Sequence, residues 1–463
     1  MRPALPRLRS SMSSRPTSTV AGLVLAAVGL VLQATAAEYT LSPSGSLTNP
    51  GTPTAPLASL EAVAASGRTF SAGDILVLRA GHHGSPVLRS RNTGTVTVRA
   101  ETGARVTLGR LVLQNATHWR IVGLEISASL DPAFDRATLV AVSGGSDNGV
   151  EDCTIYTVPN ASSWSREDWD TLACNGISIS GTRHTARNNS LRNVNFGVSV
   201  APGATHCVVS GNRIENFSGD GMRGLGDYCT FEFNEVRNCY KVNDNHDDGF
   251  QSWSTGPGGP GTGVVRGVVV RGNTFISYTD PEQPFRGSLQ GIGCFDGFFE
   301  DWIIENNVVV TDAWHGISLY GARNCRIVNN TVVDRDTAVR GVPWIMVTAH
   351  KDGSASTGNL VRNNLASDLR VDAGTATVDH NLKTTDYARH FVNWARVDLR
   401  LAAISTAVDA GSSSSAPFFD RAGMPRPLDG TGDGTPAWDI GAYEFASDLS
   451  APAAPSGLQL TGE

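Results

Sequence analysis

The chain has 463 residues and a formal net charge of −7; it contains 50 glycines, and only 17% of its residues are charged. The hydrophobic fraction of 40% argues against wholesale disorder, and the glycines show no three-residue period, which excludes collagen. The negative balance disfavours a nucleic-acid-binding protein, which usually carries a basic surface.

The first 37 residues are typical of a secretory signal peptide. Arginines precede the apolar run Val20–Leu32, and small residues follow at Ala34–Ala37. The run is shorter than the roughly 20 residues of a membrane-spanning helix. We therefore expect a secreted, periplasmic or cell-surface protein with no membrane span after signal removal. Export permits disulfides, but the seven cysteines are an odd number, so at least one stays unpaired.

Residues 38–130 predict the first coils of a repeat structure together with an amino-terminal cap. The segment Ser59–Gly67 has the composition of a short capping helix. The runs AGDILVLRAGHH and TVTVRAE are β-rich and predict strands.

The middle of the chain repeats with a base period of 22–23 residues and insertions, with the clearest coils at about 110–385. An asparagine recurs near the end of each β-rich run, at Asn189, Asn212, Asn234, Asn273, Asn307, Asn330 and Asn364. Such a period is typical of a solenoid, and stacked asparagines can bond to one another at the inter-strand spacing of about 4.8 Å. The sequence therefore predicts an all-β fold, a right-handed parallel β-helix that closes its core by stacking coils.

A glycine before an alternating strand sets the register. These glycines are Gly176, Gly197, Gly221, Gly249, Gly291 and Gly316. Because side chains alternate along a strand, the next residues should point inward; they are Ile177, Val198, Met222, Phe250, Ile292 and Ile317. The residues after those should point outward; they are Ser178, Ser199, Arg223, Gln251, Gly293 and Ser318. Insertions between each asparagine and the following glycine fall on one corner, which predicts a binding face.

The repeat is lost in residues 385–445, which end in WDIGAYEF, a motif resembling the end of many secreted bacterial β-helix proteins. We expect one β-helix domain over residues 38–445. Residues 446–463 are rich in proline, alanine and serine and predict a linker with the start of a possible further module.

An acidic group falls on the predicted binding face. Asp220 and Asp248 each precede a register glycine, so they should lie one coil apart, about 5 Å between backbones. Asp247 is adjacent, Gln251 projects from the same strand, and Asp244 and His246 lie in the preceding loop. Converging oxygens favour a hard cation, so we expect Ca²⁺ bound by Asp220, Asp247, Asp248 and Gln251. The alternative is that these aspartates only cap turns.

The paired segments DGMRGLGDY and NHDDGFQSW resemble the stacked coils of calcium-dependent pectate lyases of polysaccharide lyase family nine. The resemblance covers about 35 residues within a shared β-helix architecture. It implies that Asp220, Asp247 and Asp248 bind Ca²⁺, and Gln251 stands where the family has a fourth aspartate. The family's base is a lysine beyond the metal ligands, where this chain has Arg286 as its nearest basic residue. The string DNHD also resembles a motif of mannuronan epimerases.

The residue types suit the β-elimination of a uronide, which needs a neutralised carboxylate and a base that removes the C5 proton. Candidate catalytic residues are the basic side chains on the inserted face, namely Lys241, Arg286, His246, Arg223 and His315. Candidates for binding the glycan are Asp244, Trp253, Tyr320, Trp164 and Trp169, because aromatic faces stack on sugars.

The sequence therefore predicts a secreted, monomeric lyase that acts on an acidic polysaccharide. Three alternatives stay open. One is a glycoside hydrolase with acid and base among Asp220, Asp244, Asp247 and Asp248. Another is a uronate epimerase that uses His246 with Tyr240 or Lys241. The last is a non-catalytic glycan-binding surface protein.

Overall fold

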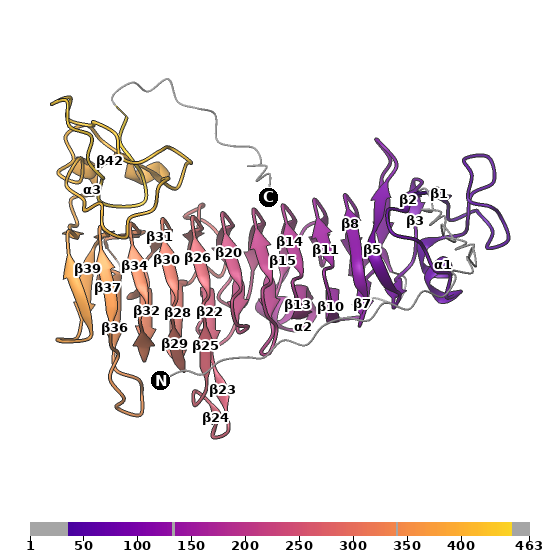
Figure 1. The fold of residues 1–463 in the computed structure, drawn as a ribbon, viewed down its shortest axis with the longest axis horizontal. Coiled ribbons are helices and arrows are strands. Elements are labelled where there is room, and N and C mark those ends of the chain that lie inside the picture. Colours follow the sequence, from indigo (N-terminus) through magenta and orange to yellow (C-terminus); the bar gives the residue numbers. More distant parts are fainter. Residues whose placement is uncertain (1–35, 132–134, 339–340, 447–463) are drawn as a thin grey trace, which may run out of the picture. The chain divides into compact units, whose positions relative to one another are not determined.

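The computed structural model describes residues 36–131, 135–338 and 341–446. Almost all of the expected signal peptide, and the segment 447–463, lie outside these residues. Short parallel strands stack into three rows, named here rows A, B and C (Figure 1). Rows A and B join into one 24-stranded sheet, and row C is a 12-stranded sheet. The architecture is a parallel β-helix, as the repeat predicts.

Row A carries the register glycines and positions the site. Its strands are β4 (Val87–Leu88), β7 (Leu111–Gln114), β10 (Thr138–Ser146), β13 (Asn175–Thr182), β16 (Val198–Val200), β19 (Met222–Gly224), β22 (Asp248–Trp253), β28 (Gln290–Asp296), β32 (His315–Tyr320), β36 (Trp344–Thr348) and β39 (Asp368–Val371).

Row B follows row A in each coil. Its strands are β1 (Glu38–Leu41), β2 (Ile75–Leu78), β5 (Arg91–Ala100), β8 (Thr117–Val122), β11 (Gly149–Glu151), β14 (Thr185–Arg187), β17 (Val208–Ser210), β20 (Thr230–Glu232), β26 (Val269–Arg271), β30 (Ile303–Glu305), β34 (Arg326–Val328), β37 (Asn359–Arg362) and β40 (Ala376–Asp379).

Row C closes the coil. Its strands are β3 (Gly81–His82), β6 (Val106–Leu108), β9 (Glu125–Ser127), β12 (Thr154–Tyr156), β15 (Ser190–Val194), β18 (Arg213–Phe217), β21 (Glu235–Cys239), β27 (Thr274–Ile276), β31 (Val308–Thr311), β35 (Thr331–Asp334), β38 (Leu365–Ala366) and β41 (Leu382–Lys383).

The described residues also form smaller elements. The strands are β23 (Thr255–Gly256), β24 (Gly259–Pro260), β25 (Val264–Arg266), β29 (Phe298–Glu300), β33 (Ala322–Arg323), β42 (Phe391–Asn393) and β43 (Asp398–Leu401), and the helices are α1 (Leu60–Ala65), η1 (Ala128–Leu130), α2 (Arg166–Leu172), α3 (Tyr387–His390) and η2 (Trp394–Arg396). None of these helices is long and apolar enough to cross a membrane.

The predicted inward residues form one column along row A. Pairing of neighbouring strands aligns Ile177, Val198, Met222, Phe250, Ile292 and Ile317. Each of them is at most 1% exposed, and they belong to the continuous apolar core of the coils. The register prediction for the inner face is confirmed.

Two of the predicted outward residues are buried. Gly293 faces the Asp248 carboxylate, because a side chain built on it would meet Asp248 Oδ1 at 2.2 Å. The Ser318 hydroxyl is covered by His315 and Trp344, which hydrogen-bond to it. The outward direction holds, but side chains at the starts of β22, β32 and β36 cover this part of row A, which strand periodicity does not reveal.

The predicted asparagine ladder is confirmed. Each side-chain amide donates to the carboxamide oxygen of the next, at 2.9–3.0 Å, along Asn189, Asn212, Asn234, Asn273, Asn307, Asn330 and Asn364. The ladder extends one coil further, to Asn381. The residue before each ladder position turns the chain with positive φ, as at Asn188 (55°) and Gly211 (66°). Asparagine and glycine tolerate that conformation best, which explains the repeated Asn-Asn and Gly-Asn pairs.

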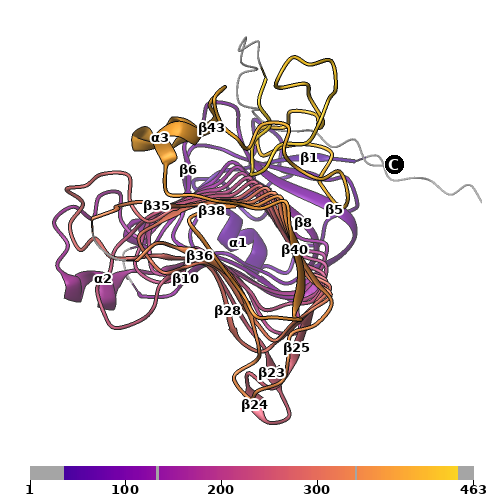
Figure 2. The same ribbon diagram turned by 90° about the vertical axis from the view of Figure 1, so that its left-hand side faces the viewer.

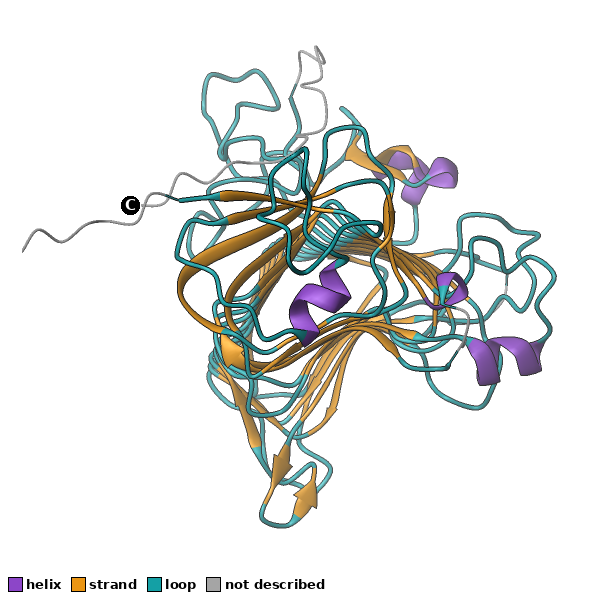
Figure 3. Ribbon diagram, turned by 90° about the vertical axis from the view of Figure 1, so that its right-hand side faces the viewer, coloured by secondary structure: helices purple, strands orange, loops and turns teal. Residues whose placement is uncertain are grey.

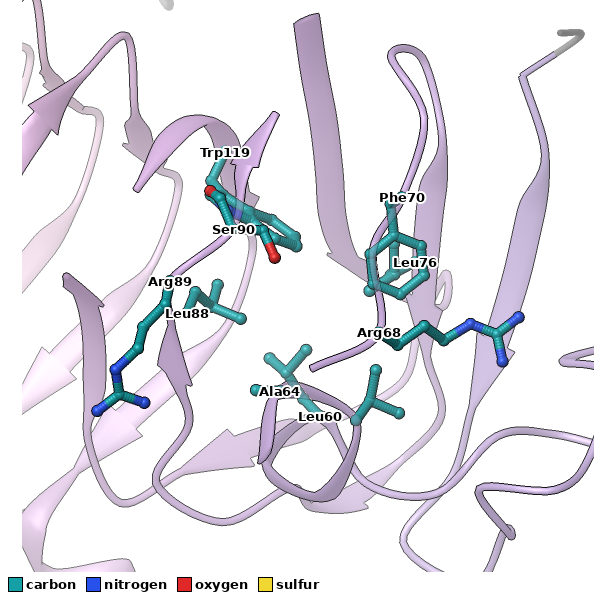
Figure 4. A pocket seen from close by; sticks show the side chains of 10 residues that line it. Leu60, Ala64, Arg68, Phe70, Leu76, Leu88, Arg89, Ser90 and Trp119 are labelled. Carbon is teal, nitrogen blue, oxygen red and sulfur yellow. The ribbon is translucent and has the colours of Figure 1, made fainter. Parts of the chain in front are cut away.

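The first coil is closed by α1, which is the purple helix at the centre of Figure 3. The Ser59 side chain caps its amino terminus by accepting the Ala62 N–H at 3.2 Å, as the capping-helix prediction requires. Between the helix and the first coils lies a cavity of about 20 Å³, into which Phe70 and Trp119 point, while Arg68 and Arg89 point away (Figure 4). Its size admits at most one water molecule.

Residues 385–446 leave the repeat and pack on row C (Figure 1). Their apolar side chains join Val310, Val333 and Leu365 in a second core cluster. Amide side chains of the coils bind this segment directly, since Asn306 donates to the Phe419 carbonyl and Asn329 to the Asp439 carbonyl. Within the described residues, all seven cysteines are buried and none forms a disulfide.

Inserted loops project from more than one corner (Figure 2). The first corner, predicted from the sequence, carries α2 with the segments 240–247 and 278–289. The hairpin β23–β24 projects from a second corner, which the spacing between ladder asparagine and register glycine did not predict.

Candidate active site

The two stacked aspartates form the base of the site. Asp220 precedes β19 and Asp248 begins β22, and Asp220 Oδ1 accepts the backbone N–H of Asp248 at 3.0 Å. Both carboxylates are buried. Burial raises the pKa of Asp220. Burial and, to a smaller extent, the charge of Asp220 raise the pKa of Asp248 to about 7, although the hydrogen bond to His246 opposes this shift.

Arg223 projects outward from β19 and faces Asp220. Its Nε lies 2.6 Å from Asp220 Oδ2. The guanidinium lies 3.5 Å from the ring centre of Phe196 and 5.3 Å from that of Trp253. Ion pairing and aromatic contacts therefore fix Arg223 as the partner of Asp220, and the predicted sugar-binding residue Trp253 contacts this guanidinium.

Asp247 lies beside Lys241. Its Oδ1 accepts the Asn245 side-chain amide at 2.8 Å, and its Oδ2 lies 3.7 Å from Lys241 Nζ. Burial raises the pKa of Asp247 to about 6, against the opposing effects of Asn245 and Lys241. The structure thus brings Lys241 to the acidic residues, as predicted.

His246 lies above Asp248. Its Nδ1 is 3.2 Å from Asp248 Oδ2, which also accepts the Gln251 amide at 3.0 Å. The imidazole is largely exposed, and its hydrogen bond to Asp248 raises its pKa. Asp248 therefore holds His246 in place and favours its protonated form.

An open cleft of about 250 Å³ crosses three successive coils in front of these residues. It is lined by Lys241, Asp244, Asn245, His246, Ser288, Gln290, Ala313, Trp314 and His315. The first four come from the loop before β22, the next two from the start of β28, and the last three from the start of β32. Polar and basic side chains therefore line a groove that runs from coil to coil.

His315 occupies the far side of the cleft. Its Nδ1 lies 2.9 Å from Ser318 Oγ, and its ring contacts Trp344 edge-on with centres 5.0 Å apart. Burial, with smaller effects from Arg370 and His246, lowers the pKa of His315. Phe295 contacts both His315 and His246 edge-on, so its ring separates the two imidazoles. Tyr320 packs on the same ring at 5.4 Å.

Three predicted residues have other contacts. Arg286 binds within its own loop, donating to the Pro281 carbonyl and lying over Tyr278. Trp169 is only 1% exposed and stacks on Tyr240, while Trp164 packs edge-on against Trp169. The burial of Trp169 leaves no face for a sugar, so its predicted binding role is wrong, and it holds the inserted loops together instead.

The side chains expected to bind Ca²⁺ are partly engaged in hydrogen bonds within the protein. Among the residues that the structure describes, no three His, Cys, Asp or Glu side chains are arranged to hold a metal. Both oxygens of Asp220 are engaged, by Arg223 and by the Asp248 N–H, and Gln251 directs its amide toward Asp248. Nitrogen donors thus occupy some of the positions that a cation would need, while Asp247 Oδ2 and Asp248 Oδ1 are buried without a hydrogen-bond partner.

Sequence reasoning missed Trp314, Gln290 and Phe295 as residues of the site. Gln290 directly precedes a register glycine, as Asp220 and Asp248 do, and Trp314 lies two residues before one. Their position relative to a register glycine could therefore have identified both. Phe295 lies five residues into an alternating strand, where only the three-dimensional stacking reveals its contact with two histidines.

The comparisons with known proteins agree with this architecture. The family model of the right-handed β-helix region matches residues 175–366, which confirms the predicted hand. The sequence matches none of the curated proteins. Among solved structures, the pectate lyase Pel9A is similar over 89% of this chain and 97% of its own, with 16% identity and a TM-score of 0.50. XylC in complex with xylose matches over 71% of this chain and 75% of its own, with 11% identity and a TM-score of 0.49. At 16% identity the likeness to Pel9A shows the fold alone, which together with the family model is that of a right-handed parallel β-helix.

Proposed function

We propose that this protein is a secreted lyase that cleaves a uronic-acid-containing polysaccharide by β-elimination. The observation that carries the proposal is the open cleft across three coils, because it brings Lys241, His246 and His315 together on the inserted face. The resemblance of the Asp220 and Asp248 coils to those of pectate lyases, and the shared fold with a named pectate lyase, support it.

Positive charge on one side of the cleft suits a uronate carboxylate. Lys241 and His246 both line the cleft, and the bond to Asp248 keeps His246 protonated above the usual pKa of histidine. Neutralising the uronate makes the C5 proton more acidic. In this proposal Lys241 and His246 bind the carboxylate, while the buried aspartates position them.

A base on the other side then removes the C5 proton. His315 is suited to this role because its lowered pKa keeps the imidazole neutral at neutral pH. Its Nδ1 is engaged with Ser318, which leaves Nε2 to accept the proton. Two histidines with oppositely shifted pKa values thereby take opposite roles.

The alternatives have less support from the geometry. The side chains of Asp220, Asp247 and Asp248 are at most 1% exposed, so they do not flank an open bond as a hydrolase's acid and base must. Tyr240, one of the proposed epimerase residues, stacks on Trp169 within the inserted loops and does not line the cleft.

The test is incubation of the mature protein with pectate, alginate and glucuronan. We expect ultraviolet absorbance from an unsaturated uronide to rise together with reducing ends. Reducing ends without that absorbance would indicate a hydrolase, and altered stereochemistry without cleavage an epimerase. Binding of a polysaccharide without any reaction would indicate a non-catalytic glycan-binding protein.

A further inference from the structure

We infer that Trp314 forms a second sugar subsite, so that the cleft binds at least three consecutive pyranose residues of a glycan. The inference rests on the proposed function for the identity of the first subsite, at Lys241 and His246. It adds a further sugar that is held by an aromatic face.

Trp314 is an exposed aromatic side chain on the floor of a polar cleft. It is 48% exposed, and its ring is nearly parallel to that of Trp344, with an interplanar angle of 26° and centres 6.0 Å apart. One face of the indole therefore lies toward Trp344, while about half of the side chain stays exposed and lines the cleft. Pyranose rings present flat apolar C–H faces that pack on such a surface.

The platform is held in place from behind. The Trp314 carbonyl accepts the Trp344 N–H at 2.9 Å. Trp344 is buried, its indole N–H donates to Ser318 Oγ at 3.3 Å, and the Arg370 guanidinium lies 3.7 Å from its ring centre. A supported ring loses little conformational freedom when a ligand packs on it, which favours affinity.

The spacing of the coils separates this platform from the basic residues by one sugar. Trp314 lies at the start of β32, two coils beyond the loop that carries Lys241 and His246. Neighbouring strands are about 4.8 Å apart, so the two groups are offset by roughly 10 Å along the stack. Adjoining sugars of a glycan are closer together than this offset, so a glycan that lies along the cleft places one sugar between the two groups, beside Gln290.

A hydrogen-bond acceptor lies between the two positions. Gln290 is on the intervening coil and lines the cleft, and its Oε1 is shielded from solvent without a hydrogen-bond partner in the structure. A buried acceptor without a partner is costly, and a rotation of the carboxamide that turns Oε1 into the cleft would let a sugar hydroxyl satisfy it. The cleft thus offers charge, an acceptor and an aromatic face on three successive coils.

The experiment compares wild type, Trp314→Ala and Trp314→Phe, with Phe418→Ala as the matched control, because Phe418 is 79% exposed on the carboxyl-terminal segment. Binding of galacturonate and mannuronate tetrasaccharides and of the monosaccharides is measured by calorimetry, and turnover is measured on pectate and alginate. We expect Trp314→Ala to raise the tetrasaccharide Kd and the KM about tenfold, with little change in kcat or in monosaccharide binding. Trp314→Phe should recover part of the loss, and Phe418→Ala should match wild type.

The outcomes separate the inference from the proposed function. If no uronide is cleaved but tetrasaccharide binding still depends on Trp314, the lyase proposal fails and the subsite stands. If cleavage occurs and Trp314→Ala keeps the wild-type Kd and KM, the subsite is refuted. A folded wild-type protein that binds none of the oligosaccharides refutes both. Circular dichroism of each variant confirms that it is folded.

Discussion

Arg223 Nε lies 2.6 Å from Asp220 Oδ2, and the other oxygen of that carboxylate accepts the backbone N–H of Asp248 at 3.0 Å. The pair therefore joins a side chain on the outer face of row A to the beginning of the next strand. Because Asp220 is fully buried, the guanidinium is the positive charge that compensates it.

Replacement of Arg223 by methionine should destabilise the fold by about 3 kcal/mol, because it leaves a buried carboxylate without its counter-charge. The double variant with Asp220→Asn should recover most of the loss. Unfolding in urea measures both. The control is Arg183→Met, which removes an ion pair to Asp147 at 2.7 Å with a mostly exposed arginine, and should lower the stability much less. Equal losses at the two positions would contradict this account.

The two histidines should differ in their kinetic effects. His315→Gln removes the proposed base and should lower kcat by about 100-fold or more, with KM nearly unchanged. His246→Gln removes a carboxylate-binding charge and should mainly raise KM. Steady-state kinetics on the cleaved polysaccharide measure this split. If His315→Gln retains full kcat, the base is another residue.

The pH dependence of kcat/KM should be bell-shaped around the ordinary histidine pKa of 6.5. The pKa of His315 is lowered below 6.5. Activity should therefore rise as the pH increases through this pKa, because the imidazole becomes neutral and can act as a base. His246 has a raised pKa, so its charge, and hence activity, is lost as the pH rises through a value above 6.5. His246→Gln should remove or shift the alkaline limb alone. A profile of wild-type shape in that variant would exclude His246 from it.

Metal removal should have no effect. Because Arg223 and the Asp248 N–H engage Asp220, we expect EDTA or added Ca²⁺ to leave both the melting temperature and the rate unchanged. The double variant Arg223→Met with Gln251→Asp frees Asp220 and adds a carboxylate, so Ca²⁺ should raise its melting temperature. A rise in the melting temperature or rate of the wild-type protein on addition of Ca²⁺ would contradict this prediction and support the metal site.

The asparagine ladder should be a major source of stability. Asn234 donates to the Val209 carbonyl and to Asn273, and it accepts from Asn212. Asn234→Ala leaves several buried groups without partners and should cost at least about 2 kcal/mol. The exposed Asn160, whose side chain only accepts the Ser162 N–H, is the matched control and should cost less than about 1 kcal/mol. Similar unfolding midpoints for the two variants would argue against the ladder's role.

The fold could be predicted because each coil repeats the same physical constraints. Asn273 and Asn307 occupy equivalent places, and a left-handed turn precedes both, so period and residue type identify them from the sequence. Phe250 and Ile292 follow a register glycine, so alternation places them inside. The side chains that cover Ser318 are His315 and Trp344, at the starts of β32 and β36, and the repeat does not specify either of them.

The site could be predicted only where it follows the repeat. Asp220, Asp247 and Asp248 were placed by register, and His246 by its neighbours. Arg223 was expected to face outward. Its ion pair with Asp220 depends on contacts with Phe196 and Trp253, which come from other coils. Trp314 was missed because its orientation depends on packing against Trp344, 30 residues further along the chain.

The carboxyl-terminal segment binds several coils from which it is far removed in the sequence. Asn306 binds the Phe419 carbonyl, and Arg421 binds Thr274, across sequence separations of 113 and 147 residues. A simple solenoid makes contacts only between neighbouring coils, so it can fray from one end. Here the coils around residues 274–365 acquire their full outer covering only when the carboxyl-terminal segment has folded against them. This segment should therefore make the last third of the solenoid unfold as a single cooperative unit.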